Sequence, residues 1–337
     1  MPHADTWLKP LPRGLYCEPG DFYIDPTHVV DRAVITHAHS DHARPGHKSV
    51  LATAETLALM RARMGPKRAG GAQQALGYGE TVTLNGVRLW LQPAGHVLGS
   101  AQVAMEYRGS RAVVSGDYKR TPDPTCAPFE PIACDVFVTE ATFGLPVFLH
   151  PPPEAEIGRL LDSVALFPER THVVGCYSLG KCQRLIALLR AAGWEAPVWL
   201  HPALVAMCAV YEANGIRFGD IRPIGASLLT GAIVLAPPGS AVPRAEKPVV
   251  VAASGRMRIR ARAKSSGAEL PLIISDHADW NELNRTIDDT GAPEVWVTHG
   301  WEAPLIHAAG LRGIRGRALR LVGYGDEDAS YTNDSNQ

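Results

Sequence analysis

The sequence lacks any long hydrophobic run. No stretch approaches the roughly 18 consecutive apolar residues that spanning a bilayer requires. The first residues, MPHADTWLKPLPRG, also lack the apolar centre of a secretory signal. We therefore expect a cytoplasmic protein that has no membrane partner.

Excess charge and paired cysteines are missing as well. The formal net charge is −1, so any affinity for a polyanion must come from a local basic patch. The six cysteines include no Cys-x-x-Cys pair, and most of them lie in apolar surroundings. We expect reduced core thiols rather than disulfides or metal ligands. They are Cys17, Cys126, Cys134, Cys176, Cys182 and Cys208.

The chain has 337 residues, of which 46% are hydrophobic, and this favours one large domain or two joined domains. Its first third has the pattern of short strands, with Asn85-Gly86 as a strong hairpin signal and a second turn at Gly109-Ser110. One helix, 55–63, interrupts them. The expected strands are 22–25, 32–36, 81–84, 87–91, 103–107, 111–114 and 136–139.

The pattern changes near Pro146, where strands and helices begin to alternate. Such alternation predicts a small parallel sheet. The expected elements here are helices 154–167, 180–192 and 203–213 and strands 171–177 and 198–200. After the Pro-rich stretch 236–248 we expect strands 249–253, 272–275 and 294–298, and a helix 279–289 with Asp279 as its N-cap.

Four side chains able to bind metal lie together in Thr36-His37-Ala38-His39-Ser40-Asp41-His42, directly after an expected buried strand. At a strand end His37 and His39 point to the same side, because side chains alternate along a strand. Asp41 and His42 continue into a turn that can fold back toward them. This arrangement offers ligands to two adjacent cations, and imidazole with carboxylate suits Zn²⁺, Mn²⁺ or Fe²⁺.

Three more candidate ligands, His96, Asp117 and His299, follow other expected strands. Each alone is a weak signal, because a single Asp or His at a strand end is most often a turn residue or a hydrogen-bonded structural residue. Together with the first motif they argue against a solvated histidine-rich loop.

The order H-x-H-x-D-H, a distant His, a distant Asp and a last His resembles the metallo-β-lactamase superfamily. The resemblance implies an α/β fold, an αββα sandwich with two divalent metal ions, Zn²⁺ first and Mn²⁺ second, at the ends of its inner strands. It also implies that Asp25, the acid of the first strand, supports the ligand loop. The implied ligands are His37, His39 and His96 for one metal, Asp41, His42 and His299 for the other, and Asp117 as the bridge.

Further segments resemble the β-CASP nucleases, a group with RNA-processing and DNA-repair members. Glu140 in Thr139-Glu140-Ala141-Thr142 and His277 in Ser275-Asp276-His277-Ala278-Asp279 match its later motifs. That group carries a cap inserted between the two. The resemblance implies a metallo-β-lactamase domain in two pieces, 1–145 and 249–325, and a β-CASP-like α/β cap over 146–248. The polar tail, 326–337, is expected to be disordered.

The segments Gly14-Leu15-Tyr16-Cys17, Ser115-Gly116-Asp117-Tyr118-Lys119-Arg120 and 139–144 are similar to bacterial ligase-associated DNA exonucleases. Members of that family work in DNA repair with an ATP-dependent DNA ligase and a helicase. The resemblance therefore implies DNA, as a single strand or a duplex end, as the partner of this chain. It also implies a functional association with such a ligase and helicase.

The implied chemistry is phosphodiester hydrolysis by water that two metals activate. Asp41, as a metal ligand, Glu140 and His277 are the predicted catalytic residues. We expect His277 to protonate the leaving oxygen or to grip the phosphate, and Glu140 to orient that imidazole and raise its pKa.

Basic residues supply candidate phosphate contacts. Arg256, Arg258, Arg260, Arg262 and Lys264 recur at every second position, and in an extended segment all five would share one face. A phosphate track and a solvated basic strand are both open interpretations. Lys119 and Arg120, next to Asp117, and Lys181, at a helix start after Gly180, are further candidates.

The favoured function is a metal-dependent DNA exonuclease in DNA repair. An RNA-processing β-CASP ribonuclease of the same architecture stays open. A small-molecule hydrolase of the thioesterase or lactonase type is disfavoured, because those folds lack the cap, Glu140 and His277. A scaffold that keeps metal only for stability is disfavoured by the complete ligand set.

Overall fold

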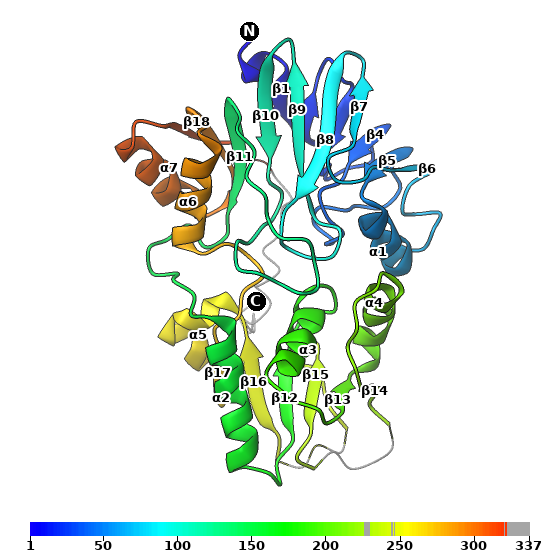
Figure 1. Ribbon diagram of the computed structural model, residues 1–337, viewed down its shortest axis with the longest axis vertical. Helices are drawn as coiled ribbons and strands as arrows, with labels where there is room; N and C mark the ends of the chain where they lie inside the picture. Colours follow the sequence, from blue (N-terminus) through cyan, green and yellow to red (C-terminus); the bar gives the residue numbers. More distant parts are fainter. Residues whose placement is uncertain (226–229, 244, 246, 320, 322–337) are drawn as a thin grey trace, which may run out of the picture. The chain divides into compact units, whose positions relative to one another are not determined.

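The computed structural model describes residues 1–225, 230–243, 245, 247–319 and 321 (Figure 1). The chain divides into two compact units, called unit 1 (Met1–Pro146 and the described residues from His277 onward) and unit 2 (Val147–Asp276). Both are of the expected mixed α/β class. Among the described residues, no helix has the length and apolar character needed to cross a membrane. The predicted disordered tail, 326–337, lies outside the described residues.

The first sheet of unit 1 has its strands in sequence order, β1 to β6. The short 3-10 helix η1 (Ala4–Thr6) precedes β1, and α1 (Ala54–Met64) joins β5 to β6. The β1–β2 and β2–β3 pairs are antiparallel, and the later pairs are parallel. The strands are β1 (Leu8–Leu11), β2 (Gly14–Cys17), β3 (Phe22–Ile24), β4 (Arg32–Val34), β5 (Ser49–Ala52) and β6 (Ala72–Ala75).

The second sheet of unit 1 has the order β19-β18-β11-β10-β9-β8-β7. Both predicted hairpins are present, although the second turns at Arg108-Gly109 rather than at Gly109-Ser110. The strands are β7 (Thr81–Leu84), β8 (Val87–Pro93), β9 (Ala101–Tyr107), β10 (Ser110–Val114), β11 (Val136–Ala141), β18 (Glu294–Gly300) and β19 (Arg315–Ala318).

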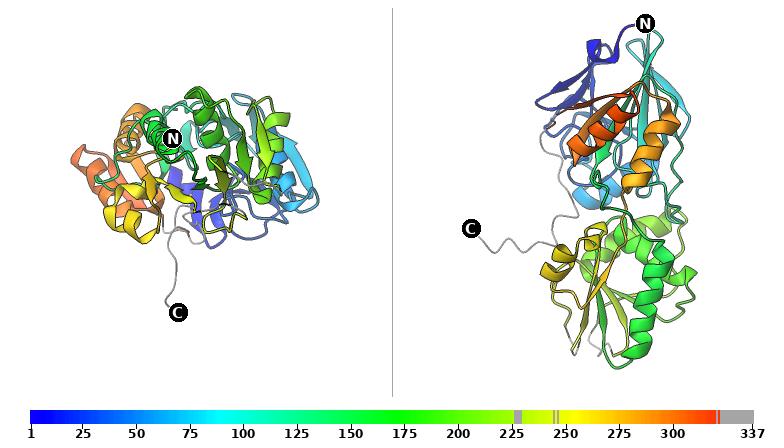
Figure 2. Two further views of the ribbon diagram at one scale, coloured as in Figure 1. Left: turned by 90° about the horizontal axis from the view of Figure 1, so that it is seen from below. Right: turned by 90° about the vertical axis from the view of Figure 1, so that its left-hand side faces the viewer.

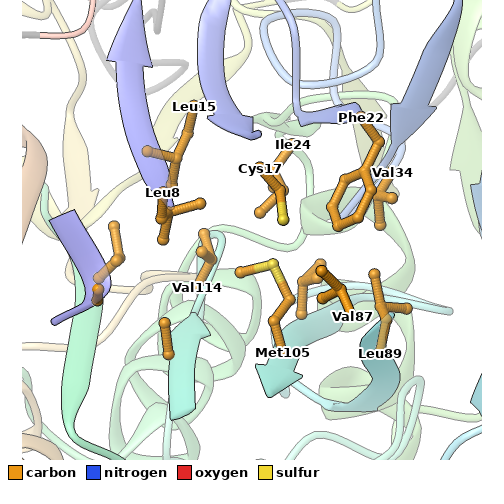
Figure 3. Packing of buried hydrophobic residues seen from close by; sticks show 14 of the residues in the cluster. Leu8, Leu15, Cys17, Phe22, Ile24, Val34, Val87, Leu89, Met105 and Val114 are labelled. Atoms are coloured by element: carbon orange, nitrogen blue, oxygen red, sulfur yellow. The ribbon is translucent and has the colours of Figure 1, made fainter. Parts of the chain in front are cut away.

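The main core of unit 1 lies between its two sheets. Figure 3 shows side chains of the first sheet, such as Leu8 and Phe22, meeting Leu89, Met105 and Val114 of the second. Alternation along each strand explains this arrangement, because every second residue points to the same face. The sequence pattern of β8 therefore buries Leu89 with its neighbours two residues away.

The outer face of the second sheet is covered by two helices, α6 (Trp280–Thr290) and α7 (Glu302–Leu311), which lie side by side (Figure 2). Leu283 of α6 and Leu305 of α7 share a second apolar cluster with Phe137 of β11. Strand β11 is thus buried on both faces, and this explains the apolar run Val136–Val138 at its start. The predicted N-cap is confirmed, because the Asp279 carboxylate accepts the backbone N–H of Glu282.

Unit 2 is built on one sheet with the order β14-β13-β15-β12-β16-β17, in which all pairs are parallel. The predicted parallel sheet is therefore confirmed. Its strands are β12 (His172–Gly175), β13 (Val198–Leu200), β14 (Ile221–Pro223), β15 (Ile233–Ala236), β16 (Val249–Ala253) and β17 (Leu270–Leu272). Its helices are α2 (Pro153–Leu166), α3 (Lys181–Ala191), α4 (Pro202–Ala213), α5 (Arg260–Ser265) and the 3-10 helix η2 (Gly255–Arg258).

Two expectations at the end of unit 2 are corrected. The first domain does not resume at residue 249, because β16 pairs with β12 in the sheet of unit 2 and β17 pairs with β16. Residues up to Asp276 therefore belong to unit 2. The expected strand 272–275 is also displaced, since β17 ends at Leu272.

As predicted, the cysteines are thiols that are not joined in disulfides, and all except the half-buried Cys126 are buried. Burial raises the pKa of Cys17 and of Cys134 to about 12. These two thiols therefore stay protonated at neutral pH and act as small apolar core residues.

Leu89 tests the core between the two sheets. We expect Leu89→Ala to lower the free energy of unfolding by about 2–5 kcal/mol, because it leaves a cavity in a fully buried cluster. The matched control is Leu311→Ala, at a side chain that is 77% exposed, which should stay within about 0.5 kcal/mol of wild type. Urea denaturation measures both, and equal midpoints for the two variants would contradict this packing.

Candidate metal centre

The ends of neighbouring strands bring the predicted ligands of unit 1 together. Strands β10, β11 and β18 are parallel neighbours, so their carboxyl ends lie at one edge of the second sheet. Asp117 follows β10, while Glu140 and His299 lie near the ends of β11 and β18. The loop after β4 joins them, because the Thr36 carbonyl accepts the backbone N–H of Ala101 at the start of β9 (2.8 Å).

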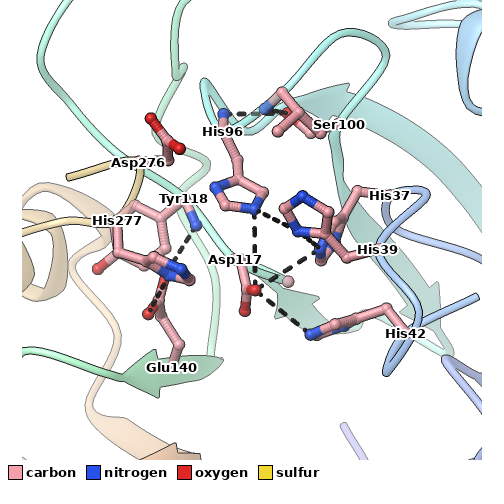
Figure 4. A network of polar contacts seen from close by, with 12 residues as sticks. His37, His39, His42, His96, Ser100, Asp117, Tyr118, Glu140, Asp276 and His277 are labelled. Carbon is pink, nitrogen blue, oxygen red and sulfur yellow. Dashed lines mark hydrogen bonds and ion pairs between the residues drawn. The ribbon is translucent and has the colours of Figure 1, made fainter. Parts of the chain in front are cut away.

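Three imidazoles converge on one point beside Asp117 (Figure 4). His39 Nδ1 lies 3.1 Å from His37 Nε2 and 3.0 Å from His96 Nε2. The Oδ2 atom of Asp117 lies 3.6 Å from the first of these Nε2 atoms and 3.8 Å from the second. All four side chains are buried. His37, His39 and His96 are the three residues that the family resemblance assigned to one metal, and Asp117 is the residue that it assigned as the bridge.

A second group shares the same Asp117 carboxylate. His42 Nε2 lies 3.4 Å from Asp117 Oδ2, and His299 Nε2 lies 3.3 Å from Asp117 Oδ1. Asp41 is close by, with its Oδ2 atom 3.6 Å from His42 Nε2. The structure therefore brings all seven predicted ligands into one cluster, in which Asp117 contacts both groups.

Hydrogen bonds at Nδ1 hold the imidazoles of His42 and His299 in these orientations. The Asp25 carboxylate lies 2.8 Å from His42 Nδ1, and it accepts both the backbone N–H (2.8 Å) and the hydroxyl (2.6 Å) of Thr36. Thr298 Oγ1 lies 2.8 Å from His299 Nδ1. With Nδ1 engaged on the outside, Nε2 of His42 and His299 faces the cluster. Asp25 occupies the supporting position that the sequence predicted.

The cluster fits a divalent metal. Tetrahedral ligands at about 2.0–2.1 Å from Zn²⁺ lie roughly 3.3 Å apart, close to the 3.1 and 3.0 Å that separate His39 Nδ1 from His37 Nε2 and His96 Nε2. The buried Asp41 Oδ1 accepts no hydrogen bond from the described residues. A cation would satisfy this carboxylate oxygen, which is otherwise costly to bury.

The pKa values of His37 and Asp117 also suit metal binding, whereas His42 would have to release a proton before it could bind a metal. Burial lowers the pKa of His37 well below its usual value, and the positive charge of His42 lowers it further. Burial opposes the charged form of His42 too, but Asp117 and Asp41 outweigh it and raise that pKa well above normal. Asp117 is likewise opposed by burial, yet the charge of His42 holds its pKa well below normal. Neutral His37 and ionised Asp117 are the forms that bind metal.

Glu140 and His277 form a pair beside Asp117. The Glu140 oxygens lie 3.1 and 3.0 Å from His277 Nδ1, and Oε1 also accepts the backbone N–H of Tyr118 (2.8 Å). The Tyr118 carbonyl accepts the N–H of Ala278 (2.6 Å). Tyr118, which follows Asp117, is thus bound through its N–H to Glu140 and through its carbonyl to the segment that carries His277. One ligand atom each of Asp117, Glu140 and His277 lies within 4.8 Å of the others.

Two relatives among curated proteins cover most of this chain, and others cover a part of it. A protein of Opitutus terrae named "Probable DNA ligase" is 30% identical over 93% of this chain and 31% of its own length. A ribonuclease of Thermus thermophilus is 24% identical over 90% of this chain and 89% of its own length. An endoribonuclease of Aspergillus fumigatus is 31% identical over 43% of this chain and 16% of its own length.

The chain belongs to the metallo-β-lactamase β-CASP nuclease family. It spans less than a third of the Opitutus protein and about a sixth of the Aspergillus protein. Among solved structures, a protein of unknown function from Enterococcus faecalis has a TM-score of 0.59 at 12% identity, over 85% of this chain and 78% of its own, which is a likeness of fold. No family model matches the chain.

The structure of this β-CASP chain corrects the predicted substrate contacts nearest the ligands. Lys119 is 1% exposed, and its ammonium group contacts Gly95, His96 and Asp123. Arg120 is mostly buried, and it pairs with Asp289 at 2.8 Å. Neither cation is presented to a nucleic acid, because protein carbonyls and carboxylates already surround them.

Lys181 of unit 2 also points inward. Its Nζ donates to the Ile274 carbonyl (2.8 Å) and lies 3.2 Å from Asp276. Arg184, which the sequence did not single out, binds the same Asp276 carboxylate at 3.1 Å. Its i+3 spacing from Lys181 on a predicted helix is a signal that could have found it.

The predicted phosphate track does not form an extended face. Arg256 and Arg258 lie in η2, and Arg260, Arg262 and Lys264 lie in the helix α5. On a helix, positions two apart point to opposite sides, so five alternating cations cannot share one face. Arg258, Arg260, Arg262 and Lys264 are nevertheless exposed, and within the described part of the chain none of them pairs with an acid.

Sequence reasoning missed the side chains that fix the ligand loops. The hydroxyls of Thr36 and Thr298 contact the imidazoles of His37 and His299, and that of Ser100 accepts the backbone N–H of His96. Thr36 and Thr298 immediately precede His37 and His299, so the repeated Thr-His pair at a strand end was an available signal.

Asp25→Asn tests the outer support of His42. The substitution keeps the side chain's size and suits the left-handed backbone at this residue (φ 42°), but it removes the charge. We expect Zn²⁺ affinity to fall roughly 10–100-fold, because the imidazole loses its acidic partner.

Competition with a chelating dye measures this affinity. Asp21→Asn is the matched control, since that nearby aspartate also has a positive φ (54°) but its side chain is 61% exposed. Equal Zn²⁺ affinity in Asp25→Asn and wild type would show that Asp25 does not support the centre.

Proposed function

We propose that this chain is a metal-dependent nuclease that degrades DNA from an end. In this proposal unit 1 is the αββα metallo-β-lactamase domain and unit 2 is the β-CASP cap. The observation that carries it is the double cluster around Asp117, with Glu140 and His277 beside it. A small-molecule hydrolase would not need that additional pair.

The ligands divide between two divalent cations, and Zn²⁺ suits their donors best. Bound there, such cations activate water as a nucleophile and offset the charge on the phosphate under attack. Asp117, which contacts both groups of side chains, would be shared by the two cations. The proposed ligands are His37, His39 and His96 on one side, Asp41, His42 and His299 on the other, and Asp117 between them.

In this proposal His277 donates a proton to the leaving oxygen. Glu140 lies against its Nδ1 atom, so the proton that the imidazole could give to a leaving oxygen is the one on Nε2. The negative charge of Glu140 favours the protonated imidazole, which an acid catalyst requires. Glu140 is itself fixed by the Tyr118 N–H, so the pair is oriented before substrate arrives.

DNA is the favoured substrate, because the relative named as a DNA ligase matches 93% of this chain at 30% identity. RNA is the second candidate, supported by the ribonuclease of Thermus thermophilus that matches over 90% of the chain. The Opitutus protein is much longer than the matched region. A working association of this chain with a DNA ligase, and with a helicase in the same repair process, is part of the proposal.

Exposed cations of unit 2 are the proposed contacts to the nucleic-acid backbone. Arg258, Arg260, Arg262 and Lys264 lie in a stretch, 255–268, that contains no acidic residue. Their charge is therefore available to phosphates, although not as a single extended track.

Asp41→Ala tests the metal chemistry. We expect cleavage to slow by at least about 100-fold, or about 2.7 kcal/mol, because one cation loses its carboxylate ligand. The measurement uses end-labelled single- and double-stranded DNA and matched RNA, with Zn²⁺ or Mn²⁺. Asp31→Ala, at an exposed aspartate before the ligand strand, is the control and should cleave normally.

The same digestion shows whether DNA or RNA is the preferred substrate. Faster shortening of DNA from a labelled end supports the exonuclease, whereas a preference for RNA favours the ribonuclease. Undiminished cleavage by Asp41→Ala would falsify the proposed metal chemistry for either substrate.

Removal of the unit 2 cations tests the phosphate contacts. In the triple variant Arg258→Ala, Arg260→Ala and Arg262→Ala, we expect weaker oligonucleotide binding. The slope of log affinity against log salt should fall by roughly 0.7 for single strands, or 0.9 for duplexes, for each phosphate that is no longer neutralised. Fluorescence anisotropy over a salt series measures this slope.

The matched control for this variant removes three arginines that already pair with acids. Arg88, Arg222 and Arg312 pair with Glu106, Asp220 and Asp288. Replacing these three with alanine should leave the salt slope unchanged. A similar decrease of the slope in both triple variants would mean that Arg258, Arg260 and Arg262 are not preferred contacts for phosphates.

A further inference from the structure

Lys119 is a buried lysine whose ammonium group has a protein acceptor for each of its N–H donors. Its Nζ donates to the carbonyls of Gly95 (2.6 Å) and His96 (2.8 Å), and it lies 2.8 Å from Asp123 Oδ2. A lysine ammonium has three N–H donors, so these three acceptors account for all of them. With the side chain 1% exposed, no donor remains for a phosphate.

The main chain of His96 is held at both of its ends. Its N–H donates to Ser100 Oγ (3.0 Å), and its carbonyl accepts from Lys119. The imidazole between these two anchors is the one that lies 3.0 Å from His39 Nδ1. Rotation of either peptide group would swing this imidazole away from the cluster.

Lys119 also joins the loops of two ligands. It comes two residues after Asp117, and its side chain reaches the turn that carries His96. The two turns also meet through their backbones, because a Cβ added at Gly95 would lie 2.5 Å from the Lys119 carbonyl oxygen. The φ of +73° at Gly95 is a second reason why this position takes glycine.

The charge of Lys119 matches its surroundings. Asp123 is buried, and its other oxygen accepts the N–H (2.8 Å) and the hydroxyl (2.6 Å) of Thr125. A neutral side chain in place of Lys119 would leave the Asp123 carboxylate without this cation and the His96 carbonyl without this donor. Both changes carry a desolvation penalty inside the protein.

We infer that Lys119 is a positioning residue for one metal of the pair: it fixes the His96 main chain relative to Asp117, and so sets the affinity of the site formed by His37, His39 and His96. The inference rests on the two-metal assignment of the proposed function. It predicts that substitution of Lys119 changes the metal affinities of the two sites unequally, although the sites share Asp117. The reason is that Lys119 contacts neither His42 nor His299 among the described residues.

The test is a Co²⁺ titration of the full chain, read from the d–d absorption of the bound metal. Wild type should bind two ions. Lys119→Met should weaken one binding step by roughly 10–100-fold, as expected when a ligand loses an outer partner, and leave the other unchanged. Lys119→Gln is the milder variant, since its amide keeps N–H donors, and it should weaken the same step less.

Ser100→Ala removes the other anchor of His96. It should weaken the same step, and the double variant with Lys119→Met should be weakened by less than the sum of the two effects, because both anchors act through one imidazole. Additive effects would overturn the inference.

Lys181→Met is the matched control. That lysine is also buried and binds a carbonyl and a carboxylate, but it lies in unit 2 and contacts no proposed ligand. It should lower the unfolding midpoint without changing either Co²⁺ step. Equal weakening of Co²⁺ binding in Lys119→Met and Lys181→Met, or unchanged binding in Lys119→Met, would overturn the inference. Fewer than two Co²⁺ ions on wild type would instead remove the two-metal assignment itself.

Discussion

One buried carboxylate, that of Asp117, organises unit 1. Ring nitrogens of His37, His42, His96 and His299 lie between 3.3 and 3.8 Å from its two oxygens. Burying so many polar groups is costly unless cations and hydrogen bonds compensate for the lost water. The rest of the unit is arranged to provide that compensation.

Each ligand loop is therefore tied to another part of the fold. Asp25 binds His42 and the backbone of Thr36, Lys119 binds the carbonyl of His96, and Glu140 binds the N–H of Tyr118 next to Asp117. These contacts join loops that follow strands of both sheets. The cluster around Asp117 therefore has little freedom to adjust its side chains one at a time, because a shift of one loop disturbs its neighbours.

The cost of burying a charge without a partner also separates the basic residues into two classes. Lys119, Lys181 and Arg120 are buried and compensate acids or carbonyls, so their charge stabilises the fold. A second class is exposed and has no acidic partner among the described residues, so its charge acts outward. It consists of Arg258, Arg260, Arg262 and Lys264. Sequence position alone suggested the opposite, because Lys119 and Arg120 are the cations closest to Asp117 in the sequence.

The sequence by itself determined the hairpin at Asn85-Gly86 and the parallel sheet of unit 2, and its resemblance to a known family indicated which side chains gather around Asp117 and that Glu140 pairs with His277. Local patterns carry the hairpin and the alternation of elements, since a turn dipeptide and the spacing of apolar residues are each readable within a short segment. The same local patterns did not reveal the helix at Arg260–Ser265 or the place of β16 in the sheet of unit 2. Only the tertiary structure decided those, together with the inward direction of Lys119, because strand pairing and burial depend on residues that are distant in the sequence.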